Sequence, residues 1–99
     1  MIKGFLAYEL AIELHRECEK IKAKHYVKDQ LERASLSIVL NLAEGSGKPT
    51  KPEQRRFYSI ALGSLRETEA LLRILQNAHS LTIANRLGGM LYRLVHPRP

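Results

Sequence analysis

The chain has 99 residues, of which 44% are hydrophobic and 26% charged, and this composition predicts one small globular domain. Its single cysteine, Cys18, cannot form an internal disulfide, and no apolar run approaches the roughly 20 residues that a membrane span needs. Met1 to Phe5 lacks the long apolar core of a signal peptide, so we expect a cytoplasmic protein with no membrane partner. The 16 Lys and Arg against 10 Asp and Glu give a net charge of +6 and a pI near 9.8. Such a charge is typical of nucleic-acid-binding domains, and positive charge that only maintains solubility is the alternative.

The spacing of apolar residues predicts four helices and no strand. The first helix is expected over 5–24, where apolar residues recur at spacings of three and four and glutamates occupy the opposite face. The second is expected over 27–44 and is followed by Gly45, which suits a left-handed C-cap. Its second half, 36–43, is apolar almost all round, so we expect another subunit to cover the side that a small bundle leaves exposed.

The third helix, expected over 51–77, has the clearest start signal. Thr50 and Glu53 form a capping box, and Pro52 stands in the first turn, where proline is tolerated. Two apolar stripes run along this helix, so we expect it to contact more than one neighbour.

The fourth helix, expected over 80–95, is less regular. Ser80 can cap it, and the pair Gly88-Gly89 costs roughly 1 kcal/mol of helix stability per glycine. The pair therefore marks either a close approach of helices or a break. Because connections this short join antiparallel neighbours, the expected fold is all-α: one domain over 1–99 that forms an antiparallel up-down-up-down four-helix bundle.

The motifs that could carry catalysis or a metal fail on inspection. The stretch G-S-G-K over 45–48 resembles a phosphate-binding loop, but Leu42 stands where the first glycine is needed and Pro49 where Ser or Thr is needed. His15 and Cys18 are one helical turn apart, yet zinc needs three or four ligands, so Cys18 is better interpreted as a small core residue. We expect no enzyme activity, no catalytic residue, no metal site and no cofactor.

A line of polar residues crosses the apolar half of the second helix. Ser37, Asn41 and Glu44 are spaced at i, i+4 and i+7, and the third helix carries Ser64 and Glu67 in a comparable patch. Buried polar groups without partners cost roughly 1–3 kcal/mol each. We therefore predict a hydrogen-bonded polar seam between these helices, with a catalytic carboxylate at Glu44 or Glu67 as the alternative.

Basic residues recur one or two turns apart on several helices, and no acidic residue follows Glu69. Such rows suit a phosphate backbone and read no base by themselves, although tyrosines could add stacking. A ring of subunits would strengthen these weak contacts by avidity. The predicted nucleic-acid-binding surface consists of Arg16, Lys20, Lys24, Lys48, Lys51, Arg55, Arg66, Arg73, Arg86 and Arg93.

Two blocks of the chain resemble a known family. Residues 37–48, S-I-V-L-N-L-A-E-G-S-G-K, are similar to the pattern S-I-x-x-N-I-A-E-G-x-G-R of the four-helix-bundle proteins encoded in 23S rRNA intervening sequences. Residues 56–69, R-F-Y-S-I-A-L-G-S-L-R-E-T-E, resemble that family's pattern R-F-L-x-I-A-x-G-S-L-x-E-x-E, in the same order. The chain departs from the family at 25–26, where His-Tyr replaces a Phe-Pro turn.

The resemblance implies a ring-shaped homopentamer of four-helix bundles. A related branch, the accessory variability determinant of diversity-generating retroelements, implies RNA or DNA and a reverse transcriptase as partners. The leading hypothesis is a non-enzymatic, nucleic-acid-binding homo-oligomer, either of the rRNA intervening-sequence type or accessory to a reverse transcriptase. The alternative is a protein-binding or structural oligomer whose positive charge is incidental.

Overall fold

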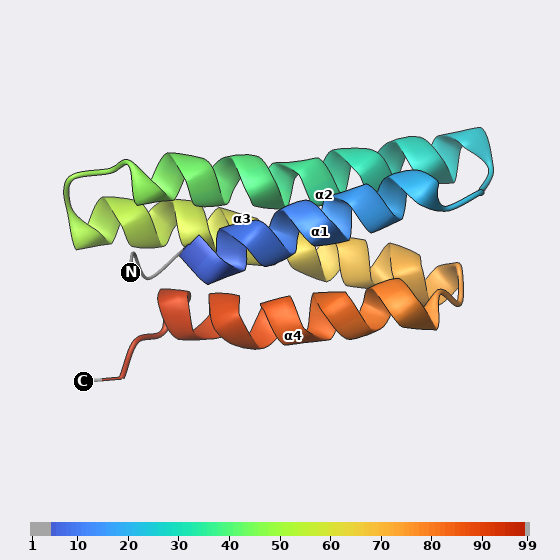
Figure 1. Cartoon of the computed structure of the whole chain (residues 1–99). Coiled ribbons are helices and arrows are strands. Elements are labelled where there is room, and N and C mark those ends of the chain that lie inside the picture. Colours follow the sequence, from blue (N-terminus) through green and yellow to red (C-terminus); the bar gives the residue numbers. More distant parts are fainter. Residues whose placement is uncertain (1–4, 99) are drawn as a thin grey trace.

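The computed structural model describes residues 5–98, which form four α-helices and no strand. They are α1 (Phe5–Lys20), α2 (His25–Ser46), α3 (Lys51–Ile74) and α4 (Ala78–Val95). The helices pack as an elongated bundle of 41 × 20 × 20 Å, in which α1 contacts α2 and α4, and α3 also contacts α2 and α4. The α1–α2 and α3–α4 connections lie at one end of the bundle, and the α2–α3 loop lies at the other (Figure 1). The predicted all-helical chain of four helices is confirmed.

One stripe of each helix builds the core. Each fully buried leucine or isoleucine side chain contributes about 1.5–3 kcal/mol relative to an exposed one. The largest fully buried apolar side chains are Leu14, Leu31, Ile38, Leu42, Leu65, Leu72, Leu87 and Leu91. Cys18 is also fully buried, which confirms its interpretation as a small core residue.

The first connection differs from the prediction, because α1 ends at Lys20 and α2 already begins at His25. Lys28 of α2 supplies the reason: its Nζ donates to the backbone oxygens of Glu19 at 2.8 Å and Ile21 at 2.6 Å. The last carbonyls of a helix need partners from outside it, and a cation suits the negative end of the helix dipole. The prediction that 21–24 continues the first helix is therefore wrong.

Gly45 does not cap α2, which continues to Ser46. No glycine between residues 5 and 98 has a positive φ, so the predicted left-handed cap is wrong. A Cβ on Gly45 would lie only 2.8 Å from Cε1 of Tyr58 and 3.1 Å from the backbone oxygen of Gln54. Glycine is needed here because α3 approaches too closely for any side chain.

The start of α3 confirms the predicted capping box. The Thr50 Oγ1 accepts a hydrogen bond from the Glu53 backbone N–H at 3.3 Å and donates to the Glu53 Oε1 at 2.7 Å. Pro52 stands in the first turn as expected. This cap fixes where α3 begins, and it thereby positions the exposed cations Lys51 and Arg55 at the end of the bundle.

The turn between α3 and α4 lies earlier than predicted and is one residue longer, because α3 ends at Ile74 and α4 starts at Ala78. Gln76 has a φ of 57°, and the Asn77 N–H bonds the Leu72 oxygen at 3.0 Å, which is a Schellman arrangement. The Asn77 side chain then accepts from the Ser80 N–H at 2.9 Å. Asn77 caps α4, and the prediction of a Ser80 cap is wrong.

Candidate nucleic-acid interface

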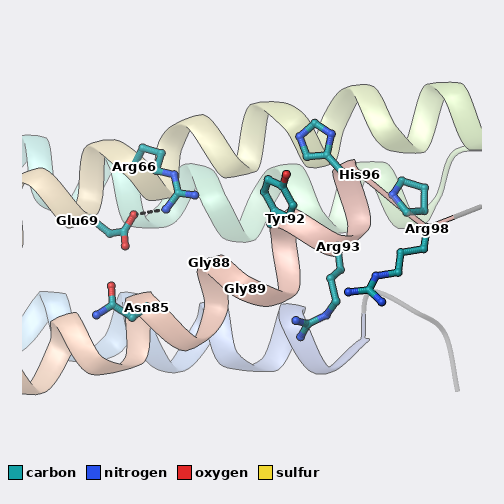
Figure 2. A pocket seen from close by; sticks show the side chains of 10 residues that line it. Arg66, Glu69, Asn85, Gly88, Gly89, Tyr92, Arg93, His96 and Arg98 are labelled. Atoms are coloured by element: carbon teal, nitrogen blue, oxygen red, sulfur yellow. Dashed lines mark hydrogen bonds and ion pairs between the residues drawn. The ribbon is translucent and has the colours of Figure 1, made fainter.

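A cleft of about 740 Å³ lies between α3 and the second half of α4 (Figure 2). We call it the α3–α4 cleft. It contains three arginines and one carboxylate, so its charge is positive. Its lining residues are Arg66, Glu69, Asn85, Gly88, Gly89, Tyr92, Arg93, His96, Pro97 and Arg98.

The pair Gly88-Gly89 forms part of the cleft wall, and α4 runs through it without a break. A Cβ on Gly88 would lie 3.6 Å from Nη1 of Arg66, and one on Gly89 would lie 3.7 Å from Nη1 of Arg93. Each glycine therefore has a guanidinium close to its backbone. Alanine would fit at these distances, whereas a larger side chain would displace a guanidinium or fill the cleft.

The three arginines of the cleft differ in their partners. Arg66 forms an ion pair with Glu69, with 2.8 Å between Nη1 and Oε1. Within residues 5–98, neither Arg93 nor Arg98 forms a salt bridge. Figure 2 shows their side chains extending to the same side at the end of α4. The unneutralised charge of the cleft is thus concentrated at the C-terminal end of α4.

An aromatic surface lies beside these charges. Tyr92 is 54% exposed, and its ring centroid lies 4.5 Å from that of His96, with 45° between the ring planes. Tyr92 lies in the last turn of α4, His96 directly follows the helix, and both line the cleft. Exposed aromatic rings next to cations can stack on nucleobases.

A smaller hollow of about 250 Å³ lies at the end of the bundle and is lined by Lys51, Arg55 and Pro97. Pro97 also lines the α3–α4 cleft, so the two basic surfaces adjoin. Lys48 is near the same loop, but its Nζ lies 3.2 Å from the Glu44 carboxylate, which offsets its charge. The hollow extends the positive surface around the C-terminal end of α4.

The groove between α1 and α4 has a different balance of charge. The predicted cations Arg16, Lys20 and Arg86 line it together with three glutamates. The Lys20 Nζ lies 2.6 Å from the carboxylate of Glu17, and this hydrogen bond lowers the pKa of Glu17. Because carboxylates match the cations of this groove, it attracts a polyanion less than the cleft does.

The remaining predicted cations lie apart from the cleft. Arg73 lines a hollow at the α3–α4 turn, and Lys24 is exposed just before α2. The basic rows expected along single helices are divided: Arg66 and Arg73 of α3 line two different surfaces, and so do Arg86 and Arg93 of α4. The cleft instead combines cations from two helices.

Part of the predicted polar seam comes together between α2 and α3. The Oγ atoms of Ser37 and Ser64 lie 2.8 Å apart, and Asn41 Nδ2 donates to the Ser37 backbone oxygen at 2.9 Å. Glu44 and Glu67 are exposed, and no hydrogen bond links either of them to this group within the described chain. The seam is thus a local network of two serines and one asparagine.

A second polar group, which the sequence pattern did not indicate, joins α1 to α2. His15 Nδ1 lies 2.8 Å from Ser35 Oγ, and His15 Nε2 lies 3.8 Å from the Glu19 carboxylate. The three residue types are those of a hydrolytic triad. Ser35, however, is fully buried and donates to the backbone oxygen of Glu32, so a substrate cannot reach its hydroxyl. The group holds the two helices together.

Cys18 lies in the same region, and burial raises the pKa of its thiol to about 11. The thiol is therefore protonated at neutral pH. Within residues 5–98, no three His, Cys, Asp or Glu side chains are grouped so that they could hold a metal ion. In the same range, no helix combines the length and apolar character needed to cross a lipid bilayer.

The fold and its surfaces define a small helical bundle with a basic cleft between its last two helices. The family model described as 23S rRNA-intervening sequence protein matches residues 5–89, and the chain belongs to this family. No curated protein and no solved structure matches the chain. The family match ends at Gly89, so Tyr92, Arg93 and Arg98 of the cleft lie beyond it.

Three residues of the cleft were not among the predicted site residues: Tyr92, His96 and Arg98. Two signals in the sequence point toward them. No acidic residue follows Glu69, and Tyr92 and His96 are spaced at i, i+4. Neither signal identifies the site by itself, because the cleft forms only when the packing of α3 places Arg66 next to α4.

Proposed function

We propose that this protein is a non-enzymatic, nucleic-acid-binding subunit of a homo-oligomer. The observation that carries the proposal is the α3–α4 cleft, in which Arg93 and Arg98 form no salt bridge with another residue of 5–98. When such guanidinium groups neutralise the phosphates of a nucleic acid, the cations condensed on it are released, and this release supplies sequence-independent affinity. Guanidinium groups also bind phosphate oxygens through two parallel hydrogen bonds.

The homo-oligomer rests on a second surface, the α2–α3 face, which we define by Leu36, Leu40, Ile60 and the Ser37–Ser64 hydrogen bond. The three apolar side chains are 41%, 57% and 44% exposed. Copies of this chain are the proposed occupants, because covering exposed apolar groups by an identical apolar surface stabilises the assembly. The family resemblance favours a ring of five, in which each basic cleft is repeated and avidity increases.

The test of nucleic-acid binding is a salt titration. A fluorescein-labelled RNA of about 20 nucleotides is mixed with the protein, and the dissociation constant is measured by anisotropy between about 50 and 200 mM NaCl. We expect binding that weakens steeply with salt, because each released counterion contributes to the slope. If the protein does not bind RNA or single-stranded DNA at about 50 mM NaCl, the proposal is wrong.

Within this proposal, the two family branches suggest different partners. For the intervening-sequence type we propose RNA as the partner, and for the retroelement type RNA or DNA together with a reverse transcriptase; the cytoplasm is the expected location of both. The neighbourhood of the gene distinguishes the branches. A reading frame inside a 23S rRNA gene supports the first, and an adjacent reverse transcriptase gene with a template repeat supports the second.

The α2–α3 face favours a second candidate function, that of a structural or protein-binding oligomer with incidental charge. Multi-angle light scattering with and without a short RNA separates the two. An oligomer whose mass does not change with RNA supports the second candidate. An oligomer whose mass increases by that of the RNA supports nucleic-acid binding.

A further inference from the structure

Tyr92 differs in its surroundings from Tyr26 and Tyr58. Tyr58 is 6% exposed and packs against Gly45, whereas Tyr26 is 63% exposed but lies at the start of α2, outside the α3–α4 cleft. Tyr92 is 54% exposed within the cleft itself, beside the arginines at the end of α4. A large aromatic ring that is half exposed among cations presents a stacking surface for a base.

The same face of α4 leaves an open position next to this ring. Asn85, Gly89 and Tyr92 are spaced at i, i+4 and i+7, so they follow one side of α4, and His96 comes directly after the helix ends at Val95. Gly89 is exposed and has no side chain, and the atom found within 4 Å of a Cβ there is Nη1 of the Arg93 side chain, at 3.7 Å. A planar group that lies against Tyr92 can therefore approach the backbone of α4, with an amide that donates and accepts at its edge.

The charges of the cleft favour one side of the ring. Glu69 offsets the charge of Arg66, with an ion pair of 2.8 Å, whereas Arg93 and Arg98 form no salt bridge within residues 5–98. A phosphate is therefore favoured toward the C-terminal end of α4. In a duplex, by contrast, paired and stacked bases cannot reach the tyrosine ring, although phosphates can reach the arginines.

From these observations, we infer that the α3–α4 cleft binds an unpaired nucleotide of a single-stranded nucleic acid. The base stacks on Tyr92 over Gly89, and its phosphate is bound by Arg93 and Arg98. This inference rests on the proposed function and deepens it by naming the form of nucleic acid that the cleft selects. The selecting residue, Tyr92, lies outside the range that matches the family model.

The test compares Tyr92→Ala with Tyr92→Phe, which keeps the ring, by anisotropy with a 12-nucleotide single strand and a blunt duplex of the same sequence. Stacking of a base on an aromatic side chain is worth about tenfold or more in affinity. We expect Tyr92→Ala to lose about tenfold for the single strand and less than twofold for the duplex, and Tyr92→Phe to bind like the wild type. Circular dichroism at 222 nm verifies that both variants fold.

A second variant, Gly89→Leu, fills the position beside Tyr92 and displaces the Arg93 guanidinium, which lies 3.7 Å from a Cβ there. We expect it to weaken single-strand binding more than Tyr92→Ala does, and to weaken duplex binding as well, because Arg93 also contacts duplex phosphates. RNA and DNA strands of one sequence show whether the 2′-hydroxyl is also contacted, since a preference for RNA requires that contact.

The outcomes separate this inference from the proposed function. If the wild type binds single strand and duplex equally, and Tyr92→Ala binds both like the wild type, the inference is overturned while nucleic-acid binding stands. If the wild type binds neither at about 50 mM NaCl, the proposed function is itself overturned. A selective loss in Tyr92→Ala that Tyr92→Phe does not share supports the inference.

Discussion

The α2–α3 face and the α3–α4 cleft share one helix, yet they have opposite surface chemistry. On the side toward α2, α3 presents the apolar Ile60 beside a hydrogen-bonded serine pair. On the side toward α4, it presents Arg66 to a cleft that holds two further arginines. A single amphipathic helix can thus contribute to two surfaces, one that protein covers favourably and one that phosphate covers favourably.

Different forces favour binding at the two surfaces. Apolar groups such as Leu40 gain free energy when they leave water, and this gain depends little on salt. Guanidinium groups such as those of Arg93 and Arg98 stay hydrated until an anion replaces their counterions, and this gain falls with salt. Assembly and nucleic-acid binding should therefore respond differently to ionic strength and to substitution.

The largest expected effect is on assembly. The double substitution Leu40→Glu with Ile60→Glu places two carboxylates on the α2–α3 face, where each apolar side chain contributes about 1.5–3 kcal/mol per subunit when buried. We expect the mass measured by light scattering to fall to that of the 11.3 kDa chain. Arg93→Gln, the matched change in the cleft, should leave the mass unchanged. An unaltered mass in the double variant would show that this face is not the interface.

The second effect concerns the packing beneath the α2–α3 face. Gly45→Ala places a methyl group 2.8 Å from the Tyr58 ring, and such overpacking costs about 1–3 kcal/mol. Gly63→Ala is the control, because a Cβ there meets no atom within 4 Å. Alanine in a helix is favoured over glycine, so Gly63→Ala should stabilise the protein by about 0.5–1 kcal/mol. If urea unfolding showed that both variants change the free energy of unfolding in the same direction, this account would be contradicted.

A third prediction compares two arginines of α4. Arg93→Gln should weaken RNA binding about five- to tenfold, or about 1 kcal/mol, and should reduce the salt slope by about 1. Arg86→Gln should change the affinity less than twofold, because Arg86 lines the groove in which three glutamates balance the cations. Anisotropy titrations at two salt concentrations measure both quantities. Equal losses would mean that net charge, and not the cleft, determines affinity.

The smallest expected effect is on the polar seam. The hydroxyls of Ser37 and Ser64 bond each other at 2.8 Å, and a half-buried neutral hydrogen bond contributes about 0.5–1 kcal/mol. A double-mutant cycle with Ser37→Ala and Ser64→Ala should give a coupling energy of this size in urea unfolding. The same pair of substitutions should leave RNA affinity unchanged. A coupling energy of zero would mean that hydrogen bonds to water replace the bond between Ser37 and Ser64 without loss of stability.

The parts of the fold that could be predicted were those with local causes. The capping box at Thr50 depends on residues within one turn, and the apolar stripes depend on a spacing within one helix. The ends of α1 and α2 were not predictable in this way. Lys28 ends α1 from another helix, and the ring of Tyr58 explains Gly45 from another helix.

The candidate site shows the same limit. The cations were identified as rows along single helices, but packing divides Arg66 from Arg73 and places Arg66 in the cleft that Arg93 also lines. The buried contact between His15 and Ser35 likewise joins residues that are 20 positions apart. Charge and periodicity indicate which residues are exposed, whereas the grouping of their side chains follows from the arrangement of the helices.

The hydrogen bonds of Lys28 have a consequence for the chemical reactivity of the lysines. Its Nζ donates to two backbone oxygens and lies 3.4 Å from the Glu32 carboxylate, so the amine must leave all three groups before it can attack a reagent. Lys22 and Lys24 nearby are exposed. With a limiting amount of acetic anhydride, Lys28 should therefore be acetylated more slowly than these two lysines. Its rate of labelling reports how often the Lys28 side chain leaves the end of α1.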